Sequence, residues 1–122
     1  MSKVNYSIYD ILDRIEKRPG MYVGDVTLGN LMTYMHGYEM AMRDAEVKDV
    51  SIPEFHGFHE FVRKKFGYYE STAGWANMIL AVTIGLSPKN IIWENYNVGV
   101  TYEQHIESVK TFYKLLNEFR HK

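Results

Sequence analysis

Histidines are the residues best suited to chemistry in this sequence, which contains no cysteine. His56 and His59 are three residues apart and would share one face of a helix. A transition-metal site needs at least a third ligand, and the neighbouring Glu60 would point away from that face. The lack of cysteine also excludes thiolate ligands. We therefore expect neither a metal site nor a cofactor. The five histidines are His36, His56, His59, His105 and His121.

Nucleophilic catalysis requires a serine or threonine beside a base, and a third group that orients the base. The serines and threonines of this chain mostly precede predicted helices, where helix capping explains them. The sequence contains no Gly-x-Ser-x-Gly segment. Paired carboxylates such as Asp10 and Asp13 lie on the polar side of a predicted helix, where water solvates them. The sequence thus predicts no catalytic residue, and we expect the protein not to be an enzyme.

Acidic residues gather between positions 39 and 60, where six acidic side chains stand against two basic ones. The whole chain, in contrast, has a net charge of only −1. An acidic surface attracts and orients a basic partner protein, such as a nuclease toxin. The alternative is a set of solvated loop and capping residues. The candidate partner-binding residues of this stretch are Asp44, Glu46, Asp49 and Glu54.

Two predicted loops are rich in aromatic residues, which make up 15% of the chain. Exposed tyrosine and tryptophan side chains often dominate the energy of protein interfaces. The same side chains are equally expected to pack onto the helices, and the sequence leaves the two arrangements open. As further candidate partner-binding residues we select Tyr68, Tyr69, Glu70, Trp93 and Glu94.

Composition excludes several classes of protein. A dedicated nucleic-acid binder usually has a clear basic excess, which a net charge of −1 does not provide. The longest stretch without formal charge, 71–88, is too short and too mixed to span a membrane. The first residues lead into no apolar signal segment. We expect a cytoplasmic protein without nucleic-acid or membrane partners, and the absence of cysteine fits a reducing compartment.

The elements that position these residues are predicted to be helices, because apolar residues recur at helical spacing through most of the chain. Capping patterns mark several starts: Ser7 with Asp10, Thr101 with Gln104 and, most clearly, Ser51 with Pro53 and Glu54. Ser71 or Thr72 is expected to cap the uncharged helix, which we predict to be the buried central one. The predicted helices span about 6–17, 27–46, 51–66, 71–85 and 101–119.

Breaker residues complete the expected architecture. Pro19-Gly20 is predicted to end the first helix before a connector over 20–25, and Gly37 is interpreted as a close helix crossing. Ser87-Pro88 is expected to open a short helical turn that continues to Trp93. No convincing strand pair appears. The sequence therefore predicts an all-α fold, a single-domain bundle of about five helices with short loops over residues 1–122.

The segment 16–25 resembles the N-terminal segment of the DNA gyrase B ATPase domain, where a helix also ends in Arg-Pro-Gly-Met-Tyr. That family then carries a Glu as general base, an Asp, and an Asn that holds magnesium. An ungapped alignment places His36, Glu39 and Met40 at those positions, and methionine cannot hold magnesium. The family's adenine-binding motif is also absent. The resemblance leaves one alternative, a nucleotide- or phosphate-binding module with a phosphate site at Arg18 and the amides of Gly20 and Gly24.

A second resemblance covers most of the chain. It comprises the Arg-Pro-Gly-Met-Tyr segment, Gly37-Tyr38, the Phe-x-x-Phe-Val run 58–62, Gly74-Trp75 and the aromatic tail 112–119. The chain is similar in this pattern to small bacterial proteins, some of which resemble immunity proteins that neutralise secreted toxins. The resemblance implies a non-enzymatic protein that binds a toxin domain directly. A homodimeric helical scaffold subunit is a further alternative.

Overall fold

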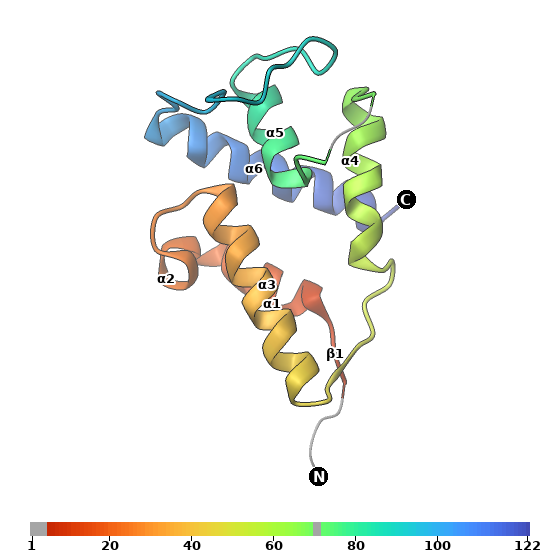
Figure 1. Cartoon of the computed structure of the whole chain (residues 1–122). Helices are drawn as coiled ribbons and strands as arrows, with labels where there is room; N and C mark the ends of the chain where they lie inside the picture. Colours follow the sequence, from red (N-terminus) through yellow and green to blue (C-terminus); the bar gives the residue numbers. More distant parts are fainter. Residues whose placement is uncertain (1–4, 70–71) are drawn as a thin grey trace.

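The computed structural model describes residues 5–69 and 72–122 and is built mainly of helices (Figure 1). Two strands of two residues each, β1 and β2, pair in parallel, with Asn5 opposite Lys48 and Tyr6 opposite Asp49. A short 3-10 helix, η1, covers Phe55–Gly57. The α-helices are α1 (Ile8–Lys17), α2 (Pro19–Val23), α3 (Leu28–Asp44), α4 (Phe58–Phe66), α5 (Trp75–Thr83) and α6 (Tyr102–Arg120); β1 is Asn5–Tyr6 and β2 is Lys48–Asp49.

The core is centred on α5, as its uncharged sequence predicted, because six of its nine residues are buried. Trp75 at its start stacks on Phe112 of α6 with ring centroids 4.9 Å apart. Phe58 of α4 meets both rings edge to face, at 5.6 and 5.5 Å. Such ring pairs add about 0.5–1.5 kcal/mol each beyond their buried area. Three helices distant in the sequence are thus joined by one aromatic cluster.

Three of the predicted helix starts are confirmed. The hydroxyl of Ser7 accepts a hydrogen bond from the Tyr9 amide, and Thr27 caps α3 through the Asn30 amide. Thr101 and Gln104 form the reciprocal capping box at the start of α6. These side chains satisfy amides that the first helical turn leaves without intrahelical partners.

The start predicted at Ser51 is wrong, because α4 begins only at Phe58, after η1. The Ser51 hydroxyl does not cap its own segment. It accepts a hydrogen bond from the Ile8 amide at 2.9 Å, at the start of α1. The peptide bond before Pro53 is cis. The capping pattern predicts that the Ser51 hydroxyl oxygen accepts the Glu54 amide. In the structure the same oxygen accepts the Ile8 amide, 43 residues away in the sequence.

Several breaker predictions also differ from the structure. Pro19 occupies the first turn of α2, where its missing N–H costs nothing, so the predicted connector is partly helical. A methyl group on Gly37 would meet nothing within 4 Å, so this glycine marks no close crossing. Gly74, not Thr72, precedes α5, and Ser71 lies outside the described residues. Ser87 and Pro88 open a turn in which the Asn90 amide donates to the Ser87 carbonyl at 3.2 Å, but no helix continues from it to Trp93.

The all-α class is confirmed, with α2 as an additional short helix and the strand pair as a small departure. The strand pair joins the residues before α1 to those after α3, which brings the segment 45–54 against the start of α1. In Figure 1 this segment lies at the same end of the molecule as the end of α3, while the irregular connection from α5 to α6 lies at the other end. This arrangement decides where the candidate residues lie.

Candidate functional site

The candidate residues chosen from the sequence lie at two opposite ends of the molecule. Asp44, Glu46, Asp49 and Glu54 belong to the end of α3 and the segment that follows it. Tyr69 follows α4 at its far end, and Glu94 belongs to the α5–α6 connection (Figure 1). The structure therefore does not unite the acidic residues with the aromatic loops, and the candidate partner-binding residues form two separate surfaces.

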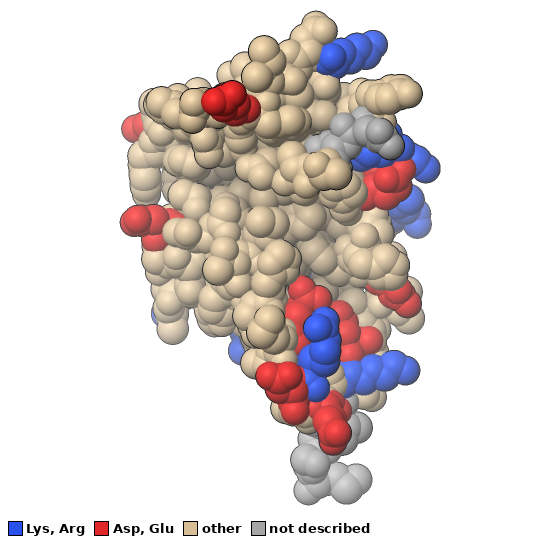
Figure 2. All heavy atoms as spheres, in the orientation of Figure 1, with Lys and Arg blue, Asp and Glu red and all other residues tan. Residues whose placement is uncertain are grey.

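The acidic edge, defined as Asp44, Glu46, Asp49 and Glu54, is exposed at all four positions. Figure 2 shows acidic side chains gathered over the end of α3 and the following segment, with basic ones among them, while the middle of this face is largely uncharged. Exposed apolar side chains belong to the same segments: Met40 is 60%, Val50 44% and Ile52 88% exposed. No pattern in the sequence predicted that these three residues belong to a binding surface.

Hydrogen bonds fix the segment 49–53 on the start of α1. One carboxylate oxygen of Asp49 accepts the Ser51 amide at 2.9 Å and also the Ser51 hydroxyl. The Ser51 oxygen in turn lies 2.9 Å from the Ser7 hydroxyl and accepts the Ile8 amide. The Tyr9 hydroxyl donates to the Pro53 carbonyl. Because Ser51 is only 5% exposed, this network is buried, and it fixes Asp49 of the acidic edge against the start of α1.

A cleft lies beside the acidic edge, between α3, η1 and the start of α5. It has a volume of about 260 Å³ and adjoins a second hollow of about 290 Å³, with Glu39, Phe55 and His56 lining both. Asp49 and Glu54 line the second hollow, so the cleft opens onto the acidic edge. We call it the histidine cleft. Its lining residues are Met35, His36, Glu39, Phe55, His56, His59 and Trp75.

Electrostatics single out Glu39 within the histidine cleft. Burial raises the pKa of its carboxyl, and the nearby Asp49 carboxylate adds to the rise, while His36 and Arg43 act in the opposite direction. The Glu54 carboxylate lies 3.0 Å from Nδ1 of His56, with both side chains exposed. The cleft thus combines aromatic walls with carboxylates, a chemistry that suits a cationic side chain.

Metal binding receives no support from this geometry. Within residues 5–69 and 72–122, no three His, Asp or Glu side chains are placed so that they could hold one ion. His56 and His59 both line the histidine cleft, together with His36, which the sequence did not connect to them. The helical spacing of His36 and Glu39 puts both on one face of α3, but it does not show that this face meets His56 and His59.

The aromatic loops are largely packed onto the helices, which is one of the two arrangements that the sequence left open. Tyr68 is 3% exposed and its hydroxyl donates to the Met78 carbonyl of α5 at 2.8 Å, so it cannot contact a partner. Trp93 is half-buried and stacks on Tyr68 at 6.0 Å. Tyr69 is 88% exposed and Glu94 is exposed, whereas Glu70 lies outside the described residues. Burial thus removes the main aromatic candidates.

The segment that resembles gyrase B forms the end of α1 and the whole of α2. The Gly24 amide donates to the Gly20 carbonyl at 3.1 Å, so it is not available to a phosphate in this arrangement. Tyr22 packs edge to face on Tyr34 at 5.9 Å, as a structural anchor would. Met21, in contrast, is 72% exposed.

Comparisons of the chain with protein-family models, with curated proteins and with solved structures find no match. In the part of the chain that the structure describes, the helices are too short or too polar to cross a membrane. The acidic edge and the histidine cleft together form the most developed candidate site on the surface of this molecule.

Proposed function

We propose that this chain is a non-enzymatic protein-binding domain, an immunity protein that neutralises a basic bacterial toxin domain by direct binding. The observation that carries the proposal is the acidic edge with Met40, Val50 and Ile52 exposed beside its carboxylates. Protein interfaces typically combine an apolar centre with a polar rim. Carboxylates raise the association rate with a basic partner, and burial of the apolar side chains supplies affinity.

The histidine cleft gives this interface an anchoring point. A lysine or arginine side chain of the partner would enter beside Glu39, against the ring of Phe55, which itself packs edge to face on the buried Trp75. There it would meet a carboxylate whose raised pKa reflects burial without sufficient positive charge around it. A cation would stabilise the ionised carboxylate, and aromatic faces add cation–π attraction.

Glu46 provides a second line of support. It holds a φ of 60° where α3 ends, and its amide donates to the Arg43 carbonyl at 3.0 Å. Glycine is the usual residue at this left-handed position because a Cβ is strained there. A glutamate at this place sacrifices stability and adds a carboxylate to the acidic edge, which fits a role in binding.

The wider resemblance to small bacterial proteins, on the residues given above, supports the immunity class. An immunity protein of this kind acts where the toxin would harm its own producer, so we place the chain in the cytoplasm. The proposed partner is then a toxin domain encoded directly upstream, at the C-terminal end of a large secreted protein.

Co-expression tests the proposal. The toxin domain encoded upstream is produced in a host cell with and without this chain, and growth is followed. We expect growth to stop with the toxin domain alone and to resume with the chain, and we expect the two purified proteins to elute as one complex. No rescue together with no complex would overturn the proposal.

Charge reversal locates the binding surface. The double variant Asp44→Lys/Glu54→Lys changes two exposed carboxylates that make no contact in the Ser51 network. We expect its affinity for the toxin domain to fall by about 1.5–3 kcal/mol, roughly tenfold to a hundredfold. Glu103→Lys/Glu107→Lys on α6 is the matched control, since both residues are exposed and lie outside the acidic edge. Equal losses for both variants would refute the assigned surface.

A further inference from the structure

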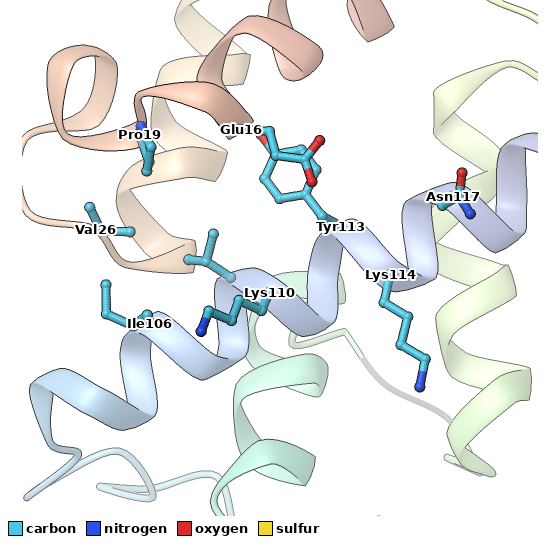
Figure 3. Close-up of a pocket in the computed structure, with 9 residues that line it drawn as sticks. Glu16, Pro19, Val26, Ile106, Lys110, Tyr113, Lys114 and Asn117 are labelled. Carbon is cyan, nitrogen blue, oxygen red and sulfur yellow. The ribbon is translucent and has the colours of Figure 1, made fainter.

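A further hollow lies between α6 and the corner formed by α1, α2 and the residues before α3 (Figure 3). Its volume is about 470 Å³, within the usual range of small-molecule sites. None of its lining residues belongs to the acidic edge or the histidine cleft. We call it the α6 groove. It is lined by Glu16, Pro19, Val26, Ile106, Val109, Lys110, Tyr113, Lys114 and Asn117.

The groove opens where α6 and the N-terminal helices diverge from the points at which they are joined. The Tyr113 hydroxyl donates to the Leu12 carbonyl of α1 at 2.7 Å, and Arg120 pairs with Asp13 at 2.8 Å. These bonds fix α6 against α1. Beyond them the chain turns at Pro19 into α2, which moves the wall away from α6 and leaves Val26 facing Ile106 across the hollow (Figure 3).

The lining has an apolar part and a cationic rim. Pro19, Val26 and Ile106 lie together at one end, and the Lys110 ammonium extends along this end toward Ile106 (Figure 3). Glu16, the one carboxylate among the described lining residues, lies instead beside the ring of Tyr113. The apolar end therefore has the Lys110 ammonium at its edge, whereas the Glu16 carboxylate lies away from it.

The two lysines of the rim are available for a ligand. Lys110 and Lys114 are exposed and one helical turn apart on α6. Among the described residues, neither forms an ion pair with a carboxylate of the chain. In Figure 3 the Lys110 ammonium lies beside the apolar end, whereas the Lys114 side chain points away from it. An unpaired cation beside an apolar hollow favours an occupant that has an apolar body and a negatively charged head.

We infer that the α6 groove binds a small amphiphile with an anionic head, of the class of medium-chain carboxylates. The apolar body lies on Val26, Ile106 and Val109, where it removes apolar surface from water. The carboxylate lies at the rim beside Lys110. A cationic amphiphile would meet repulsion at the same rim, so the sign of the head group distinguishes this site from a nonspecific apolar surface.

Decanoate, below the concentration at which it forms micelles, is the probe. Isotope-labelled protein is titrated with decanoate and, separately, with decyltrimethylammonium, and amide shifts are followed by nuclear magnetic resonance. We expect saturable shifts at Val26, Ile106 and Val109 with decanoate, and at least about tenfold weaker binding of the cationic amphiphile. Equal binding of the two probes, or saturable shifts confined to another surface, would overturn the inference.

Variants separate the head from the body of the ligand. Lys110→Glu is expected to weaken decanoate binding about tenfold, while Lys89→Glu, an exposed change in the α5–α6 connection, leaves it unchanged. Ile106→Trp fills the apolar end and is expected to abolish binding, with an unchanged circular dichroism spectrum as the control for folding. Undiminished binding to both groove variants would contradict the assigned site. A mass that rises with protein concentration, without any response to decanoate, would show instead that a second copy covers the groove.

Discussion

Removal of the Ser51 hydroxyl is expected to loosen the acidic edge and destabilise the fold at once. In Ser51→Ala, the amide of Ile8 loses its hydrogen-bond acceptor. Since Ile8 is 0% exposed, water cannot easily replace that acceptor. A buried donor left unsatisfied costs about 1–3 kcal/mol. The Asp49 carboxylate also loses the hydroxyl that it accepts. We therefore expect the free energy of unfolding to fall by about 2–3 kcal/mol.

Urea unfolding followed by circular dichroism measures this loss, which corresponds to a Tm about 8–12 °C lower for a domain of this size. The slope of the free energy against urea should not change, since the surface exposed on unfolding is the same. Ser87→Ala is the matched control, because Ser87 is exposed and lies in the α5–α6 connection; it should change the free energy by less than about 0.5 kcal/mol. A loss below that value for Ser51→Ala would refute the role given to its hydroxyl.

Four further predictions follow from burial and charge. Phe112→Ala should cost about 3–5 kcal/mol in urea unfolding, because the ring is 0% exposed, and Tyr102→Ala, at a side chain 70% exposed, should cost far less. Glu46→Gly should raise the free energy of unfolding by about 0.5–1 kcal/mol and weaken toxin binding; a stability loss would contradict the strain assigned to its φ of 60°. Glu39→Gln should stabilise the protein at pH 7 and leave its stability unchanged near pH 3. The pKa of the Glu39 carboxyl is raised in the folded state, so the ionised carboxylate destabilises the fold, and this cost develops as pH rises above the carboxyl pKa of the unfolded chain. Stability should also fall as pH rises from 10, because burial raises the pKa of Tyr6, Tyr9, Tyr68 and Tyr96 to about 12, so the unfolded chain loses their protons first; flat stability between pH 10 and 12 would exclude this linkage.

Local rules of sequence predicted the helices whose starts and cores depend on near neighbours. The capping box of Thr101 with Gln104 is confirmed because both partners lie within one turn. The absence of charge between Glu70 and Lys89 predicted the central position of α5, since a segment without charges has no solvated face. These features involve residues a few positions apart, which the sequence shows directly.

Long-range contacts explain what the sequence could not predict. Ser51 matches a capping pattern, but its hydroxyl bonds to Ile8, and only the folded chain brings these residues together. Tyr68 follows a helix and was expected in a loop, yet its hydroxyl reaches Met78 and it is buried. The convergence of His36, His56 and His59 depends in the same way on how α3 packs beside η1. The acidic residues were recognisable from their spacing, whereas the apolar side chains exposed beside them were not.

The most direct test of the central claim is a map of the surface that the toxin domain covers. Isotope-labelled chain is mixed with the unlabelled toxin domain encoded upstream, and the amides that lose exchange with water or shift are assigned. We predict that they cluster at Met40, Asp44, Val50, Ile52 and Glu54, on the acidic edge and its apolar centre. A footprint confined to the α5–α6 connection or to the α6 groove would contradict the account.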